Sequence, residues 1–387
     1  MKRTLTFLIE SHLDQRDYIR FGIEYLTSRY IVQILDCTHF VYPKIPEQLD
    51  TTLDSGYQYT FISSSKELSN IDPVGIGGIV IDVLGESISG NLVRRHLLKR
   101  GGLRVVLRLG KLHFTSVPLL ERLSGLLQKA CRPDFIFRLL QQVIMVTKRK
   151  FVPVRPIDII VHGGAASIDI SANLEINAHS FDYDRWRSLT ISKKANQGRY
   201  ALFLDEDIVY HPDYARFGIK HRVTEGTYYT AMNRFFDDYQ QYTGIPVYIA
   251  VHPRSQYLKR PHLWGNRKLL HGEAPEAVSG ASHIFIHFST AISFAILSNK
   301  PITHLISNEI MKSFMGRQII GISQFLNTTL LNIDYELDRN VTLKLNQIDI
   351  AQYRVYKNLY IKTDDSVEAP LWEIIADTVD RKMAKTA

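Results

Sequence analysis

The sequence is poor in cysteine and has no long apolar run. Among its 387 residues, Cys37 and Cys131 are the two cysteines, and they have neither a Cys-X-X-Cys nor a zinc-ligand spacing. This argues against a disulfide framework or a structural zinc site and favours a reducing, cytoplasmic compartment. The first apolar run ends after a few residues at Glu10, so it predicts a strand and not a signal peptide. No stretch approaches the roughly 20 apolar residues of a membrane-spanning helix.

The common motifs of nucleotide-binding and hydrolytic enzymes are also missing. There is no GxxxxGK[ST], HExxH or GxSxG motif and no kinase motif set. Two glycine-rich stretches, at 75–78 and 162–167, lack the complete GxGxxG pattern. A dinucleotide-binding fingerprint is therefore not supported.

The composition is that of a soluble globular protein. Apolar residues make up 45% and charged residues 22%, and the length favours two domains at roughly 100–200 residues each. The net charge is +8, from 47 Lys and Arg against 39 Asp and Glu. Such an excess suits a phosphate-bearing ligand, an anionic membrane surface or nucleic acid. The basic positions include Arg94, Arg104 and the run 148–150, all in the first half.

Short β-rich runs alternate with helix-like segments along the whole chain, which predicts βαβ units and parallel sheets. We expect helices at 15–28, 87–99, 117–146, 224–242, 289–298 and 370–385. The expected strands are 4–9, 30–35, 78–83, 103–109, 157–161, 200–204, 247–251, 283–287 and 301–305. A polar junction at 192–199 divides the chain into domains 1–192 and 193–360. Residues 361–387 then form a C-terminal helix that we expect to pack back on the first domain.

Polar residues follow the strands of the second half, where ligands of parallel sheets bind. The acids Asp205, Glu206 and Asp207 follow strand 200–204, and carboxylates there serve as bases, nucleophiles or metal ligands, or simply form a solvated turn. His252 and Arg254 follow strand 247–251. A histidine can bind a phosphate or protonate a leaving group, and an arginine presents a planar fork to phosphate or carboxylate.

The next strand ends in His287, followed by Ser289 and Thr290 at the start of a helix. A helix N-terminus with two hydroxyls can bind phosphate, although serine and threonine are also ordinary helix caps. Glu273 precedes another helix, where it can accept from a ribose diol or complement the helix dipole. In the first half, Glu10 and Arg16 follow the first strand, and we expect them to face an acceptor substrate.

In their order along the chain, these residues resemble the motifs of bacterial glycosyltransferases that use CMP-activated 2-keto sugar acids, the bacterial sialyltransferases and Kdo transferases. The resemblance spans about 199–305 and implies a GT-B-like α/β fold, two Rossmann-like domains facing across a cleft. It implies that His252, Ser289 and Thr290 bind the donor phosphate and that Glu273 contacts the ribose. Ile208 stands where the sialyltransferases have glycine after the acids, which favours a Kdo-transferase-like relative.

The resemblance also implies a reaction. Asp205, or else Asp207, supplies the carboxylate at the anomeric centre, and His252 acts on the leaving CMP. We also expect Arg254 or a nearby lysine to clamp the donor carboxylate. Glu206 and His287 join Glu10 and Arg16 as substrate-binding residues. We expect transfer of Kdo or a nonulosonate to a glycan or lipid-linked acceptor in bacterial surface polysaccharide synthesis (O-antigen, capsule or lipopolysaccharide), without metal or cofactor. The enzyme would be cytoplasmic or peripheral on the inner membrane face.

Two alternatives stay open on the sequence. One is a GT-B glycosyltransferase that uses a UDP- or GDP-sugar, whose two phosphates would call for more cationic groups or a metal. The other is a basic nucleic-acid-binding protein, although no basic run interleaves with aromatic residues in a known binding motif.

Overall fold

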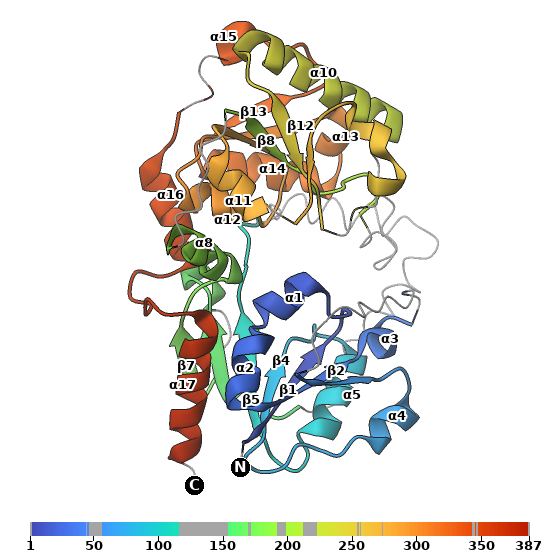
Figure 1. The fold of residues 1–387 in the computed structure, drawn as a ribbon, viewed down its shortest axis with the longest axis vertical. Helices are drawn as coiled ribbons and strands as arrows, with labels where there is room; N and C mark the ends of the chain where they lie inside the picture. Colours follow the sequence, from blue (N-terminus) through green and yellow to red (C-terminus); the bar gives the residue numbers. More distant parts are fainter. Residues whose placement is uncertain are drawn as a thin grey trace, which may run out of the picture.

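The computed structural model describes residues 2–43, 45, 56–115, 154–168, 172–191, 199–211, 223–253, 255, 257–272, 274–342, 345 and 347–385. These residues form two α/β units, which lie one above the other in Figure 1. The helix expected at 117–146, the basic run 148–150 and most of the 192–199 junction lie outside the described residues.

The first unit is built on a parallel sheet with the strand order β3-β2-β1-β4-β5-β6-β7. Its strands are β1 (Thr4–Ile9), β2 (Ile31–Asp36), β3 (Gln58–Phe61), β4 (Ile79–Asp82), β5 (Leu103–Arg108), β6 (Ile159–His162) and β7 (Leu174–Asn177). The sequence predicted the five inner and central strands but not the edge strands β3 and β7. Those two carry partly exposed side chains and lack a buried apolar run.

Helices cover both faces of this sheet. They are α1 (Gln15–Arg20), α2 (Ile23–Arg29), α3 (Thr38–Val41), α4 (Ser65–Asn70) and α5 (Ile88–Leu97). Along β1, Phe7 belongs to the core under α1 and α2, whereas Leu8 belongs to the core under α4 and α5. This alternation is the period-two pattern of a strand buried on both sides. The single helix expected at 15–28 is broken at Gly22, whose φ is +56°.

The second unit repeats the topology. Its sheet order is β10-β9-β8-β11-β12-β13, again with every pairing parallel. The strands are β8 (Ala201–Leu204), β9 (Val247–Ala250), β10 (Leu269–Leu270), β11 (His283–Ile286), β12 (Ile302–Ile306) and β13 (Thr329–Asn332). Counted from the start of each unit, the first six strands run 3-2-1-4-5-6, the order of a Rossmann fold.

The helices of the second unit are α10 (Glu225–Thr243), α11 (Ala274–Gly280), α12 (Ile292–Leu297), α13 (Asn308–Met311), α14 (Phe314–Phe325), α15 (Arg339–Thr342) and α16 (Ile350–Tyr356). Short helical turns lie at Ala165–Ser167, Tyr257–Lys259, Pro261–Trp264 and Lys357–Ile361. Helix α10 follows Thr224 and ends at Gly244, whose φ is +68°, as the sequence predicted.

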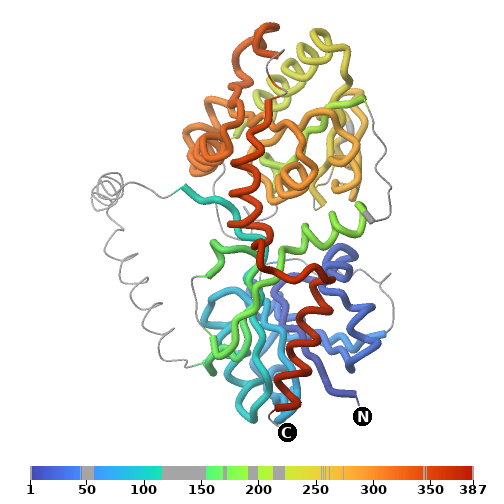
Figure 2. Tube along the Cα trace, turned by 90° about the vertical axis from the view of Figure 1, so that its left-hand side faces the viewer, coloured from blue at the N-terminus to red at the C-terminus, as the bar shows by residue number. Residues whose placement is uncertain are grey.

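Two helices pack against the unit to which their position in the sequence does not assign them. Helix α8 (Phe181–Ile191) comes before residue 192, yet it contacts α11 and α12, and its Tyr183 is part of the second core. Conversely, α17 (Leu371–Ala384) packs against the first unit (Figure 2), where Leu371 and Trp372 join the first core. The Trp372 indole N–H donates to the Arg20 carbonyl at 2.7 Å.

The segment that follows β5 also contacts the second unit. His113 stacks on Phe325 of the second unit with ring centroids 4.4 Å apart, and the Thr115 amide donates to the Gln318 side chain at 2.8 Å. Phe114 lies edge-on to Phe288, which follows β11. The first unit therefore contributes a segment to the carboxyl edge of the second sheet.

Two of the basic residues noted in the sequence are engaged internally. Arg94 is 4% exposed and pairs with buried Asp82 at 2.7 Å, and Arg104 reaches the same carboxylate at 2.8 Å. These two residues do not supply a basic surface for nucleic acid or membrane. None of the described helices is long and apolar enough to cross a membrane.

Candidate functional site

The acidic residues and the serine–threonine pair meet at one point of the second sheet. Strands β8 and β11 are neighbours, and the strand order reverses between them. In sheets of this topology, ligands bind in the crevice at the carboxyl ends of those two strands. Asp205–Asp207 follow β8, Ser289 and Thr290 follow β11, and the Phe288 amide donates a hydrogen bond to the Glu206 carboxylate.

The first two acids are buried and hold strand ends together. Asp205 accepts hydrogen bonds from the backbone amides of Asp207, at 3.0 Å, and His252, at 3.4 Å, which joins the ends of β8 and β9. Burial raises the pKa of Asp205 to about 7. Burial likewise raises the pKa of Glu206 to about 8, and the neighbouring Asp205 charge adds to the rise. These two carboxyl groups therefore retain protons close to neutral pH.

Asp207 differs from its neighbours. Its backbone is left-handed, with a φ of +50°, which is uncommon for a residue with a side chain. Burial raises the pKa of Asp207, but the nearby charges of His211 and Arg260 and a hydrogen bond from Tyr257 act in the opposite direction. Its carboxyl group therefore faces cationic and hydrogen-bond-donating side chains rather than backbone amides.

These cationic side chains extend the site to His252. The rings of His211 and His252 have centroids 4.9 Å apart, and the Arg260 guanidinium stacks 3.6 Å above the Tyr210 ring. The sequence predicted His252 but missed His211, Tyr257 and Arg260. These three follow no spacing pattern, and only the folded loops after β8 and β9 bring them beside Asp207.

Ser289 and Thr290 form the turn before helix α12. The helix begins at Ile292, later than the predicted start at Ser289. The Ser289 hydroxyl accepts from the Ala291 amide at 3.3 Å, and Thr290 is exposed. Both side chains therefore lie at the carboxyl edge, beside Phe288 and the buried acids.

His287, expected to bind substrate, is instead a core histidine. It is fully buried, with Nδ1 2.7 Å from the Leu305 carbonyl and Nε2 2.9 Å from the Tyr228 hydroxyl. Burial lowers its pKa to about 4, so the ring is neutral at physiological pH. Because both nitrogens are already engaged, the ring has none to offer a ligand. Glu206 is similarly committed, since its carboxylate accepts from the Phe288 amide.

The two residues expected in the first unit lie at the carboxyl edge of its sheet. Glu10 accepts from the Gly85 amide at 2.8 Å and from the Tyr42 hydroxyl at 3.2 Å, so it braces loops. Arg16 pairs with Asp17 at 3.2 Å and also interacts electrostatically with Asp182 of α8. Helix α1 therefore approaches the second unit.

Arg254 and Glu273 lie outside the described residues. Within the part of the chain that is described, no group of three or more His, Cys, Asp or Glu is placed to hold a metal ion.

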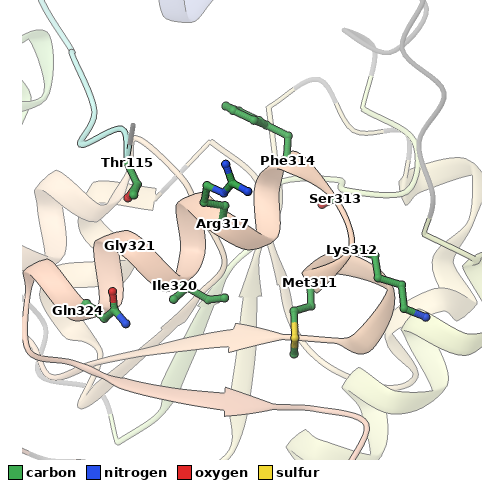
Figure 3. A pocket seen from close by; sticks show the side chains of 9 residues that line it. All are labelled: Thr115, Met311, Lys312, Ser313, Phe314, Arg317, Ile320, Gly321 and Gln324. Atoms are coloured by element: carbon green, nitrogen blue, oxygen red, sulfur yellow. The ribbon is translucent and has the colours of Figure 1, made fainter. Parts of the chain in front are cut away.

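A cavity of about 530 Å³ lies near the same edge of the second sheet (Figure 3). Helices α13 and α14, which follow β12, form most of it, and Thr115 of the first unit closes one side. Its walls carry both apolar and basic groups, among them Phe314, Lys312 and Arg317. The volume falls in the range of small-molecule sites.

Two comparisons with solved structures, each with a TM-score of 0.51, agree with this architecture. A structure of the wall teichoic acid polymerase TagF, with CDPG, aligns with 99% of this chain and 89% of its own, with a TM-score of 0.51 and 8% identity. A second TagF structure gives a TM-score of 0.51 at 7% identity over 100% of this chain and 90% of that one. MurG of Acinetobacter baumannii aligns over 98% of this chain and 100% of its own, with a TM-score of 0.43 and 9% identity.

No protein-family model and no curated protein sequence matches the chain. At such low identities the structural likeness concerns the fold. The expected fold class, an α/β GT-B-like arrangement of two Rossmann-like units, is confirmed.

Proposed function

We propose that this protein is a glycosyltransferase that transfers a 2-keto sugar acid, Kdo or a nonulosonate, from its CMP-activated donor to a glycan acceptor of a bacterial surface polysaccharide. One observation carries the proposal. Histidine, arginine and hydroxyl side chains gather beside a carboxylate at the strand-order reversal of a Rossmann-like sheet. The fold shared with TagF supports a transferase of this general kind.

The donor phosphate suits the groups present. A CMP-activated sugar carries one phosphate, whose charge His252, His211 and Arg260 can balance as it leaves. The hydroxyls of Ser289 and Thr290, at the adjacent strand end, add hydrogen-bond donors. This set of groups can act without a metal ion or other cofactor.

Asp207 is the better choice for the carboxylate at the anomeric centre. Asp205 is committed to two backbone amides, and its raised pKa favours the neutral acid. Burial raises the pKa of Asp207 as well, but the charges of His211 and Arg260 and a hydrogen bond from Tyr257, which also bonds Asp205, favour its ionised form. In its ionised form, the Asp207 carboxylate stabilises the positive charge that develops on the sugar as the bond to phosphate breaks.

Location at the inner face of the cytoplasmic membrane completes the proposal. Acceptors of surface-polysaccharide synthesis are commonly carried on lipids, and the chain has a net charge of +8. Basic side chains near an anionic membrane contribute about 1 kcal/mol each. Flotation with vesicles containing anionic lipid, but not with neutral vesicles, is the expected result.

A ligand screen tests the donor class. Because a ligand that binds only the native state raises its stability by mass action, CMP is expected to raise the melting temperature more than UDP or GDP. A larger shift with UDP or GDP would overturn the choice of donor in favour of the other nucleotide sugars.

Variants then test the roles. His252→Ala is expected to weaken CMP binding in calorimetry and to slow transfer. Asp207→Asn is expected to lower the transfer rate by about 10²- to 10⁴-fold with CMP binding retained. The exposed Asp72 of the first unit provides the control, since Asp72→Asn should leave both measurements unchanged. Full activity in Asp207→Asn would remove that residue from the reaction.

A further inference from the structure

A cluster of polar side chains outside the donor site lies at the carboxyl edge of the first sheet. It comprises His12 after β1, Asp36 at the end of β2, Thr38 and His39 on α3, and Tyr59 on β3. Helices α1 and α3, which flank the cluster in the sequence, lie on the side of the first unit that is turned toward the second (Figure 1). The cluster therefore stands at the edge where a substrate shared by the two units would lie.

Asp36 is held as an ion in the centre of the cluster. It is 1% exposed, yet it accepts hydrogen bonds from the Thr38 amide and hydroxyl and, at 2.6 Å, from the Tyr59 hydroxyl. His12 Nδ1 lies 2.6 Å from the same carboxylate oxygen as Tyr59. These donors lower the pKa of Asp36 despite its burial. The carboxylate therefore stays charged across the physiological range.

The ionised Asp36 fixes the tautomer of His12. Because a carboxylate can only accept, the proton of the neutral imidazole sits on Nδ1, and Nε2 presents a lone pair. Nε2 is buried and has no hydrogen-bond partner among the described residues, and the same holds for Nε2 of His39. The two rings have centroids 5.1 Å apart. His12 Nε2 can accept a hydrogen bond, and His39 can donate one in its Nε2–H tautomer. The pair therefore suits a group that both donates and accepts, which is the property of a hydroxyl.

We infer that His12 is the general base that deprotonates the acceptor hydroxyl, with Asp36 as its positioning residue. The inference rests on the proposed function, because it concerns the acceptor of that same transfer. It assigns the acceptor to a sugar hydroxyl bound at the first unit, against the His12 ring and its apolar neighbour Phe61, whose ring centroid is 6.2 Å from that of His12.

The step balances as a single displacement. The hydroxyl proton moves to His12 Nε2, and the acceptor oxygen forms a bond to the anomeric carbon. The bond from that carbon to the phosphate oxygen breaks, and its electron pair leaves with CMP. Asp36 stabilises the imidazolium, which later returns its proton to solvent. Asp207 is then left with the single task of stabilising the positive sugar centre.

The test separates transfer to the acceptor from cleavage of the donor. His12→Asn is expected to lower kcat for transfer by about 10²- to 10⁴-fold. CMP affinity and the slow hydrolysis of the donor by water should stay within about twofold of the parent protein. His12→Ala should regain part of its transfer activity when imidazole is added, and Asp36→Asn should lower kcat without changing the donor KM.

His96 provides a matched control. It is a partly buried histidine of the same unit whose Nε2 contacts the Ile71 carbonyl at 2.7 Å, away from the cluster. His96→Asn should retain parental transfer, and circular dichroism of each variant checks that it folds. Transfer near the parental rate in His12→Asn, or an equal loss of transfer and hydrolysis, would overturn the inference. Failure of the proposed function would show differently, as a parent protein that neither binds CMP nor cleaves a CMP-activated sugar acid.

Discussion

The two units share one strand order, yet they treat the acids at their carboxyl edges in opposite ways. In the first unit, four hydrogen-bond interactions, two from Thr38 and one each from Tyr59 and His12, hold the pKa of Asp36 below its ordinary value. In the second unit, burial raises the pKa of Glu206 to about 8. A place at the carboxyl edge therefore does not decide whether an acid is ionised. The hydrogen-bond donors around its carboxyl group decide it.

This difference suits two tasks. An ionised carboxylate orients a histidine and stabilises its protonated form, which is what a base at an acceptor site needs. Neutral buried acids instead link strand ends and place Asp207 among cationic side chains. We expect that the edge of each unit has been adapted to one substrate of the proposed reaction.

The first comparison replaces one acid at each edge by its amide. Asp36→Asn should lower the free energy of unfolding at pH 7 by about 3 kcal/mol, since hydrogen bonds to a charged group contribute about 1.5–3 kcal/mol each. Glu206→Gln should cost no stability at pH 7, because the amide removes a group that the folded protein keeps protonated at a pH where the unfolded chain ionises it. Urea unfolding of both variants measures the contrast, and equal losses would contradict it.

A glycine of the first unit gives the next effect. A Cβ on Gly22 would lie 2.3 Å from Trp372 Cδ1, and the residue has a φ of +56°. Gly22→Ala should therefore cost about 2 kcal/mol through left-handed strain and overpacking. Thermal unfolding measures the loss. An unchanged melting temperature would show that Trp372 of α17 is not packed tightly against Gly22.

The pH dependence of stability should differ between the two edges. Asp205 and Glu206 ionise near pH 4 when unfolded but at about 7 and about 8 when folded, so the native state binds more protons between these values. Stability should fall as pH rises from about 4 to about 8, by up to about 1.4 kcal/mol per pH unit for each group. Asp36, with its lowered pKa, acts oppositely and loses its contribution only under acid conditions.

Unfolding experiments in urea at pH 5, 6, 7 and 8 follow this trend. In Glu206→Gln the decline should become shallower, because one of the two titrating groups has been removed. A decline of the same steepness in parent and variant would mean that Glu206 is already ionised in the folded protein.

The smallest effect is a gain. Gly226, in the first turn of α10, has open space where a Cβ would stand. Gly226→Ala should therefore stabilise the protein by about 0.5 kcal/mol, because it restricts the unfolded chain without a clash. A loss of stability measured by thermal unfolding would contradict the expectation that an alanine side chain fits at position 226.

The sequence was sufficient for the central strands and for α10. Buried runs such as Ile79–Asp82 and His283–Ile286 are nearly continuous in apolar residues, and Thr224 and Gly244 bracket α10. It was not sufficient for contacts that depend on pairing between strands. His12 and Asp36 meet because β1 and β2 are neighbours in register, which no local spacing reveals.

The same limit explains His287. Its place at a strand end matched that of a ligand-binding residue, but the carbonyl of Leu305 and the hydroxyl of Tyr228 come from other elements. Likewise, Arg94 and Arg104 contribute to a net positive charge in the sequence, whereas in the fold they neutralise Asp82.

The position of α17 has a consequence for how the protein is made. Leu371, Trp372 and Ile375 complete a core that also contains Leu5 and Phe7, which leave the ribosome long before them. At ~5–20 residues per second, these apolar strands wait on the order of 20–70 seconds for their last partner. The buried core of the second unit begins at Tyr183 and ends at Ile361, so its parts are synthesised closer together in time. The nascent first unit is therefore the part for which chaperones should matter most, and deletion of α17 should reduce the yield of folded protein.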